Sequence, residues 1–190
     1  TALIGASVLL GILVGSIVGG YLTDLIGRKK MFVADIIAIA LFSALSTTDT
    51  TPLLLVVYRF FIGVFVGADY PIATSLITEF TPKHHRAISM GMVSAAWYLG
   101  ATVAAVVGFA LCDVDGGWRL MLGSAIVPCV FLLIGRCKVP ESPLWLKSKG
   151  RHEEARRVVF RVYGADVILE DEEEEPKRKA GFAEVFSKGY

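Results

Sequence analysis

The chain has 190 residues, of which 54% are hydrophobic and 19% are charged, and its formal net charge is +1 at pH 7. Its mean hydropathy of +0.61 is far above what a soluble globular domain needs for its core, and the near-neutral charge points to no particular partner. The apolar residues lie in long blocks with almost no charge, and the chain after about Lys138 is polar. This pattern favours a polytopic membrane protein over a soluble helical bundle, whose helices would each need a polar face.

Five apolar blocks are long enough to cross a hydrocarbon core of about 30 Å as helices. The fifth block reaches that length once Trp118 and the flanking Arg119 and Arg136 extend to the membrane interfaces. We therefore expect an all-α fold, with transmembrane helices over residues 1–138 and a linker with short amphipathic helices over residues 139–190. The expected spans cover residues 2–23, 31–47, 53–78, 87–111 and 118–136.

Basic residues alternate between the connections of these expected helices. Residues 24–30 and 81–86 and the segment after Gly135 carry lysine or arginine, whereas residues 46–52 and 112–117 carry neither. The positive-inside rule therefore predicts that the first three segments, and with them the C-terminal tail, are cytoplasmic. An odd number of spans that begins outside, without an initiator methionine, leads us to expect a longer protein with a helix upstream.

Small residues recur at every fourth position in three of the expected helices. Such stripes let helix backbones approach closely in lipid, so we expect them to pack helices together. The spacing is common in polytopic proteins and is weak evidence for transport on its own. The stripes consist of Ser7, Gly11, Gly15 and Gly19, of Gly63 and Gly67, and of Gly100, Ala104 and Gly108.

Asp69 lies deep in the expected third helix. An acid at such a depth costs roughly 2.5–3.5 kcal/mol to insert, so we expect it to face the bundle interior. Pro71 cannot donate to the carbonyl of Gly67, which predicts a kink and a freed carbonyl at about the same depth. We interpret Asp69 either as a proton-coupling or substrate-contacting group, or as a hydrogen-bonded acid that holds two helices together.

Arg59 lies about 15 Å from Asp69 along the same helix, too far for the two to pair directly. No other expected span offers an acid at that depth, so we expect the partner of Arg59 to lie outside this chain. Asp35 lies in the first turns of its helix, where the helix dipole and nearby Arg28 or Lys29 favour its charge. We expect a structural role for Asp35.

The sequence contains no HExxH, CxxC pair, nucleophile elbow or phosphate-binding Gly-Lys loop, the motifs that would indicate an enzyme or an ATP-driven pump. Its three cysteines have no metal-ligand spacing. We therefore expect a protein that is not an enzyme, with no catalytic residue, metal or cofactor. The cysteines are Cys112, Cys129 and Cys137.

Three segments resemble signatures of the major facilitator superfamily. GYLTDLIGRKK matches Gly-x-x-x-Asp-x-x-Gly-Arg-Lys, which lies between helices two and three of that family. YRFFIGVFVGADYPIATSLITEFTPKHHR and PESPLWLKSKGRHEEARRVV are similar to the fourth-helix signature and the segment after helix six in its sugar-porter and metabolite:proton symporter branch. The resemblance implies that the five spans are helices two to six of a twelve-helix transporter, and that residues 139–190 form most of its cytoplasmic linker.

The resemblance also implies roles for individual residues. Arg59 would pair with a first-helix acid in proton-coupled members, and Asp69 before Tyr-Pro is more similar to phosphate and organic-anion symporters than to hexose carriers. The family also has a network of charged residues that closes the cytoplasmic side. Leu144 stands where the family has arginine, so this chain lacks one member of that network. The implied cytoplasmic gate consists of Gly20, Asp24, Gly27, Arg28, Lys29, Glu79, Arg86 and Glu141.

The polar segment contains the signals of two short helices. Ser142 can cap a helix that begins at Pro143 and ends at Gly150. A second helix over residues 152–163 would be amphipathic, and the acidic run EDEEEE after it is expected to be a solvated linker. The apolar face of the second helix consists of Ala155, Val158, Val159 and Val162.

Together these features predict a secondary active transporter, a proton-coupled symporter of a small polar or anionic metabolite that works by alternating access. The substrate would be a sugar, an organic acid or a phosphate-like anion. The partners would be that substrate, protons, the lipid bilayer of a bacterial inner membrane or plasma membrane, and the remaining helices, without nucleic acid. The alternatives left open are a non-transporting sensor or receptor on the same scaffold and a fragment that is inactive alone.

Overall fold

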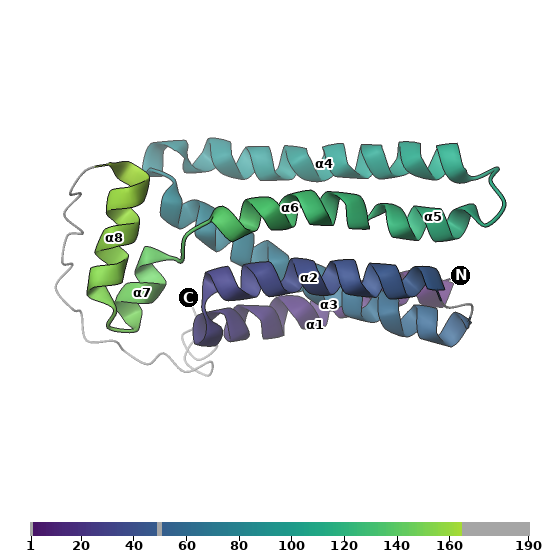
Figure 1. Cartoon of the computed structure of the whole chain (residues 1–190), viewed down its shortest axis with the longest axis horizontal. Helices are drawn as coiled ribbons and strands as arrows, with labels where there is room; N and C mark the ends of the chain where they lie inside the picture. Colours follow the sequence, from purple (N-terminus) through teal and green to yellow (C-terminus); the bar gives the residue numbers. More distant parts are fainter. Residues whose placement is uncertain (1, 49–50, 165–190) are drawn as a thin grey trace, which may run out of the picture.

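The computed structural model describes residues 2–48 and 51–164, which are almost entirely helical and contain no strand. Six helices run roughly along one direction, and two short helices lie across one end of this bundle (Figure 1). The bundle consists of α1 (Ala2–Ile26), α2 (Arg28–Thr48), α3 (Pro52–Phe80), α4 (Arg86–Leu111), α5 (Gly117–Ser124) and α6 (Ile126–Lys138). The end is covered by α7 (Pro143–Ser148) and α8 (His152–Tyr163), and the turn η1 (Lys83–His85) precedes α4.

Five stretches of the described residues are long and apolar enough to cross a membrane. Large apolar side chains such as Leu9, Ile17 and Phe131 are exposed on them, as expected of surfaces that face acyl chains. The predicted all-α polytopic fold is therefore confirmed. The stretches are Leu3–Ile26, Arg28–Thr48, Pro52–Phe80, Lys83–Leu111 and Gly117–Lys138.

The backbones of α1 and α3 are in direct contact. Gly15 of α1 lies so close to α3 that a Cβ added to it would overlap the carbonyl oxygen of Val64. In the opposite direction, a Cβ on Gly67 of α3 would overlap the carbonyl oxygen of Ile12. The two predicted stripes thus pack against each other, which maximises dispersion contacts where no hydrophobic force drives helices together. The same close approach occurs at Gly11, Gly19 and Gly63.

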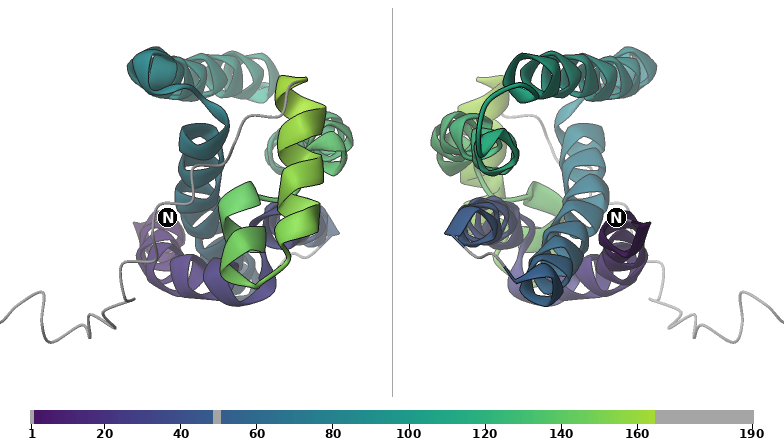
Figure 2. Two further views of the ribbon diagram at one scale, coloured as in Figure 1. Left: turned by 90° about the vertical axis from the view of Figure 1, so that its left-hand side faces the viewer. Right: turned by 90° about the vertical axis from the view of Figure 1, so that its right-hand side faces the viewer.

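The third predicted stripe, in α4, does not pack against any described helix. Nothing lies within 4 Å of a Cβ built on Gly100 or Gly108, and no residue of α4 is buried. Figure 2 shows α4 at the edge of the bundle, joined to it mainly through its two ends. No described helix covers this stripe, so the expectation that it packs two helices together stays a prediction.

The fifth predicted span, residues 118–136, is divided into two helices. Helix α5 ends at Ser124 and α6 begins at Ile126. Pro128 has no N–H to donate to the carbonyl of Ser124, four residues earlier, which accounts for the break at this point. Pro71, by contrast, lies inside the continuous helix α3, and the kink expected there stays a prediction.

The segment after the last span begins as its sequence predicts. The hydroxyl of Ser142 accepts a hydrogen bond from the backbone N–H of Trp145 at 3.0 Å, so it caps α7. Gly150 follows α7 with φ of +75°, a conformation that glycine adopts without strain. Trp145, Leu146 and Ala155 form a buried cluster between α7 and α8.

The apolar face predicted for α8 is only partly buried. Ala155 and Val159 are buried and Val158 packs against the cluster, whereas Val162 is exposed. The face therefore docks α8 on α7 through its first two turns. The acidic run, residues 170–175, lies outside the described residues.

The contact between α1 and α3 generates a first prediction. Gly15→Ala is expected to lower the unfolding temperature of the full-length protein in detergent, because overpacking typically costs about 1–3 kcal/mol and the Val64 carbonyl is backbone. Gly5→Ala is the matched control, since open space surrounds Gly5 in the same helix; it should be neutral or slightly stabilising. Equal unfolding temperatures for the two variants would contradict this packing.

Candidate functional site

Three charged side chains from three helices meet inside the bundle. Arg136 of α6 lies between Asp35 of α2 and Asp69 of α3, and its Nη1 is 2.9 Å from Oδ1 of Asp35. Its Nη2 donates to Oδ2 of Asp69, also at 2.9 Å. Arg136 is only 8% exposed and Asp35 only 1%. This set, the Asp35–Arg136–Asp69 cluster, therefore joins α2, α3 and α6 through buried charge.

The backbone and ring of α2 hold the guanidinium of Arg136 in place. Its Nη1 also donates to the carbonyl of Phe32 at 2.8 Å, and its Cζ lies 3.9 Å from the centre of the Phe32 ring. Asp35 is fixed in turn, because Oδ1 accepts the backbone N–H of Ile36 at 2.6 Å. These charge-assisted hydrogen bonds and the cation–π contact give the cluster a defined geometry.

The cluster has one cation for two carboxylates, so its formal charge is −1 when both acids are ionised. Oδ2 of Asp35 and Oδ1 of Asp69 are buried, and neither accepts a hydrogen bond from the described residues, although Oδ1 of Asp69 lies 2.9 Å from Nη1 of Arg136 in an ion pair. Because a buried charge without a hydrogen bond is costly, a proton on either oxygen would relieve the excess charge. The side chain of Asp69 is 27% exposed and that of Asp35 is 0%, so water can reach Asp69 more readily.

The structure corrects two expectations about these residues. Asp35 pairs with Arg136, and not with Arg28 or Lys29 as its place in the helix suggested. Arg136 was expected to extend to the membrane interface, but it is buried. The cluster lies toward the end of the bundle that carries α7, since Asp35 is in the second turn of α2 and Arg136 in the last turn of α6. The feature of the sequence that could have predicted this cluster is that two apolar spans each carry an acid, Asp35 and Asp69, and a third span ends with Arg136.

Arg59 takes no part in this cluster. Its Nε is buried and has no hydrogen-bond partner within residues 2–48 and 51–164. This agrees with the expectation that its partner lies outside the chain, which stays a prediction. Asp69 and Arg59 are thus two separate polar positions on α3.

Several residues of the predicted gate come together where the bundle meets α7. Arg28 forms an ion pair with Glu79, whose second carboxylate oxygen accepts a hydrogen bond from the hydroxyl of Ser142. We call Arg28, Glu79 and Ser142 the Arg28–Glu79 cluster. It joins the start of α2, the end of α3 and the cap of α7. The sequence predicted Ser142 only as the cap of α7 and not as a hydrogen-bond donor to Glu79.

The connection between α1 and α2 is also tied to the segment before α7. The backbone N–H of Lys29 donates to Oε1 of Glu141 at 2.8 Å, and the indole N–H of Trp145 donates to the Asp24 carbonyl at 3.0 Å. Gly27 has φ of +118°, and a Cβ there would lie 2.9 Å from Oε2 of Glu141. Only glycine therefore suits this tight connection.

Two members of the predicted gate lie apart from these contacts. Arg86 is exposed, and its Nε donates to the backbone carbonyl of Thr81 at 3.3 Å. Gly20 has open space where a Cβ would be. The structure thus brings together Asp24, Gly27, Arg28, Lys29, Glu79 and Glu141, but not Arg86 or Gly20.

A cavity of about 450 Å³ lies between α1, α3 and α4, beside Pro71. Its aromatic residues are Tyr70 of α3 and Trp97 and Tyr98 of α4, and Ser16 and Ser94 add hydroxyl groups. A concave wall with aromatic faces and a few hydroxyls suits a small polar molecule. Tyr70 follows Asp69 directly in the chain, so the cavity and the charged cluster share the same turn of α3.

Known proteins match the chain over almost its whole length. A family model described as sugar (and other) transporter matches residues 1–185. The chain is 46% identical over 186 residues to the putative metabolite transport protein YaaU of Escherichia coli K12, which covers 98% of the chain and 41% of YaaU. It is 39% identical over 171 residues to the inner membrane metabolite transport protein YgcS of the same strain, covering 90% of the chain and 38% of YgcS.

A solved structure has the same arrangement of helices. The partially occluded, inward-open form of the xylose transporter XylE from E. coli matches with a TM-score of 0.76 at 26% identity. The match covers 85% of this chain and 44% of the XylE chain. The chain thus spans about two fifths of the length of the curated relatives YaaU and YgcS.

The buried cluster generates a second prediction. Arg136→Met is expected to destabilise the full-length protein by about 3–5 kcal/mol, because it leaves two acids buried without their cation. Adding Asp35→Asn should restore part of that loss. The measurement is thermal unfolding in detergent, with Arg119→Met as a control, since Arg119 is exposed beside Trp118. If Arg136→Met lowers the unfolding temperature no more than Arg119→Met does, the cluster does not hold α2, α3 and α6 together.

Proposed function

The chain belongs to the sugar (and other) transporter family, and from that premise we propose that it forms part of a proton-coupled symporter of a small polar metabolite. Transport would proceed by alternating access, in which two halves of a transporter rock around a central site. The protein would be a multi-pass membrane protein with the α7–α8 end in the cytoplasm, as the distribution of lysine and arginine favours.

The Asp35–Arg136–Asp69 cluster is the observation that carries this proposal. A proton on Asp69 leaves one carboxylate for one guanidinium, whereas its loss leaves an excess negative charge inside an apolar bundle. Protonation would therefore weaken the attraction between Asp69 and Arg136, while the hydrogen bond between Asp35 and Arg136 persists. Helix α3 would be held to α6 when Asp69 is ionised and would be less constrained when Asp69 is protonated.

The cavity beside Pro71 supports the link between this proton and a substrate. Asp69, Tyr70 and Pro71 are consecutive, so a movement of α3 that separates Asp69 from Arg136 also moves one wall of the cavity. A ligand that prefers one position of that wall shifts the proton equilibrium, which is the thermodynamic requirement for coupling.

The wall of this cavity favours a neutral, hydroxyl-rich substrate over an anionic one. The part of the wall formed by described residues carries aromatic and hydroxyl side chains and no lysine or arginine. Phosphate or carboxylate groups are usually bound through Arg or Lys, which this wall lacks. A sugar or polyol therefore fits this part of the wall better than the phosphate-like anion that the Asp-Tyr-Pro sequence suggested.

The Arg28–Glu79 cluster would act as the cytoplasmic gate. It joins three segments through an ion pair and a hydrogen bond to one carboxylate, with Glu141 binding the neighbouring backbone. Contacts of this kind, present in one state and broken in another, give two discrete arrangements rather than a continuous deformation. Such a gate would favour the state in which the α7–α8 end is closed.

Asp69→Asn tests the coupling. A panel of sugars, polyols and small carboxylates is first screened for substrate-dependent proton uptake into proteoliposomes that contain the full-length protein. With the substrate so found, Asp69→Asn is expected to abolish accumulation driven by a pH gradient and to retain exchange without a gradient. Asp113→Asn, in an exposed connection, should behave like the unmodified protein. Undiminished accumulation with an unchanged pH dependence would remove Asp69 from the mechanism.

A second comparison tests the gate. Glu79→Gln removes the charge that binds Arg28, whereas Arg86→Ala removes an exposed side chain that donates a 3.3 Å hydrogen bond to the carbonyl of Thr81. We expect Glu79→Gln to shift the protein toward the state open at the α7–α8 end, measured as faster labelling of a cysteine introduced in the cavity beside Pro71. Arg86→Ala should change that rate little, and equal acceleration by both variants would contradict the assignment.

A further inference from the structure

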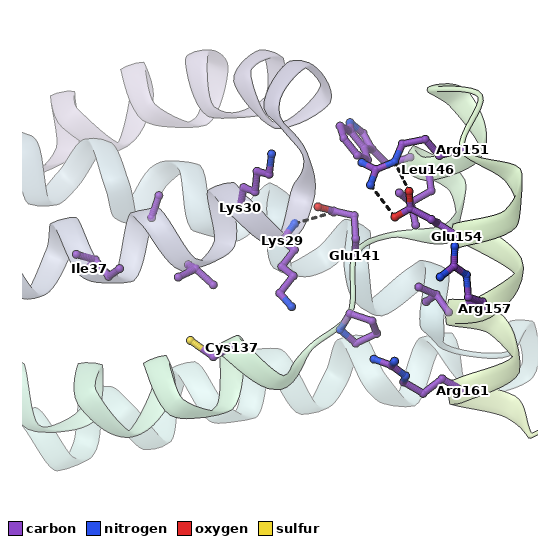
Figure 3. A pocket seen from close by; sticks show the side chains of 15 residues that line it. Lys29, Lys30, Ile37, Cys137, Glu141, Leu146, Arg151, Glu154, Arg157 and Arg161 are labelled. Atoms are coloured by element: carbon purple, nitrogen blue, oxygen red, sulfur yellow. Dashed lines mark hydrogen bonds and ion pairs between the residues drawn. The ribbon is translucent and has the colours of Figure 1, made fainter.

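A larger cavity lies at the α7–α8 end, separate from the cavity beside Pro71. It encloses about 790 Å³ between the start of α2, the end of α6 and the helices α7 and α8 (Figure 3). Five basic residues line it: Lys29 and Lys30 from α2, Arg151 just before α8, and Arg157 and Arg161 from α8. We call it the basic cavity. Lys29 and Arg161 extend toward the same space from opposite sides, whereas Lys30 points away from Lys29 (Figure 3).

The two acids that line the basic cavity already have partners. Arg151 donates to both carboxylate oxygens of Glu154, at 2.7 and 2.6 Å, and this hydrogen bonding holds the pKa of Glu154 below its usual range. Glu141 accepts the backbone N–H groups of Lys29 at 2.8 Å and Ser142 at 3.2 Å. Glu154 is thus paired with Arg151, and Glu141 is bound by two backbone N–H groups.

Apart from Arg151, the cations of the basic cavity form no ion pair with acids of the chain that the structure describes. No ion pair engages Lys29 or Arg161 among residues 2–48 and 51–164, and Arg157 makes only a 3.4 Å hydrogen bond to the carbonyl of Glu153. Several cations around one cavity repel one another unless an anion lies between them. This arrangement is suited to a multivalent oxyanion, and above all to a phosphate.

One wall of the basic cavity is apolar and belongs to two membrane-spanning stretches. Val33, Ala34 and Ile37 line it from α2, and Cys137 lines it from α6. Ile37 is exposed, so this wall continues onto the lipid-facing side of the bundle. A free phosphate would use only the basic end of such a cavity. A molecule with a phosphate group and an acyl chain would use both parts.

We propose that the basic cavity binds an anionic phospholipid, with its phosphate between Lys29, Arg157 and Arg161 and an acyl chain along α2 and α6. Basic pockets between helices at a membrane surface are suited to such headgroups, since each basic residue near the surface strengthens binding. The site depends on the bundle spanning a bilayer and not on transport, so it can fail or succeed independently of the symport mechanism.

Binding of short-chain lipids to the full-length protein in detergent tests this proposal. Calorimetric titrations compare dihexanoyl phosphatidylglycerol with dihexanoyl phosphatidylcholine and with inorganic phosphate. We expect phosphatidylglycerol to bind, phosphatidylcholine and phosphate to bind at least tenfold more weakly, and the affinity to fall with added salt. The double variant Arg157→Gln/Arg161→Gln should lower the affinity roughly thirtyfold.

Two further variants separate charge from folding. Arg157→Lys/Arg161→Lys keeps the charge and should retain most of the binding. Lys83→Gln/Lys138→Gln removes two charges from the same end of the protein but outside the basic cavity, and it should bind phosphatidylglycerol normally. Equal losses in the two glutamine variants would overturn the proposal, as would equal binding of phosphatidylcholine.

Two other outcomes would also overturn it. Inorganic phosphate that binds as tightly as phosphatidylglycerol would identify a site for a soluble anion. Binding that appears only after Glu172, Glu173, Glu174 and Glu175 are changed to glutamine would show that the acidic run of the chain itself competes for the cavity.

Discussion

The contact between Arg136 and two aspartates is the constraint on which the arrangement of α2, α3 and α6 depends. These helices present mostly apolar side chains to one another and to lipid, and in a bilayer apolar contact alone gives little preference for protein over lipid. A buried guanidinium with two carboxylates is different, because leaving any member without a partner costs several kcal/mol. The positions of Asp35, Asp69 and Arg136 therefore fix how these three helices lie relative to one another.

The other interactions divide the bundle into parts of unequal rigidity. Helices α1 and α3 meet backbone to backbone over successive turns, from Gly11 to Gly19, and neither can slide without steric overlap. Helix α4 has no buried residue and is joined through its ends. Helix α3 belongs to both the rigid pair and the charged cluster, so any change at Asp69 is passed directly to α1. The predicted coupling thus rests on one stiff helix pair that a single protonation site can hold or release.

Hydropathy and local signals predicted most of the fold. The membrane-spanning helices and the cap at Ser142 follow from composition and spacing, because each depends on neighbours within one helix. The resemblance to the major facilitator superfamily is confirmed by the match to XylE, and the family by the match over residues 1–185. The open face of α4 depends on what lies beside that helix, and local sequence does not contain that information.

The site was predicted less completely, for the same reason. Asp69 was recognised because an acid deep in an apolar helix is costly on any arrangement. Its partner was not, because Arg136 lies near a helix end, where a basic side chain ordinarily extends to the interface. Arg86 is the opposite case: its place in a motif assigns it to the gate, whereas in this structure its side chain contacts the Thr81 carbonyl, so its role stays a prediction.

The end of the bundle near α7 combines the proposed gate and the basic cavity around the same short connection. Lys29 binds Glu141 through its backbone N–H, and its side chain lines the basic cavity. An anion at the ammonium group therefore does not compete with Glu141 for Lys29. It would instead hold α8 toward α2 through Arg161, across the segment that carries Glu141 and Ser142. Because Ser142 also donates to Glu79, lipid binding and the closed gate would favour the same position of α7, and each would stabilise the other by the same free energy.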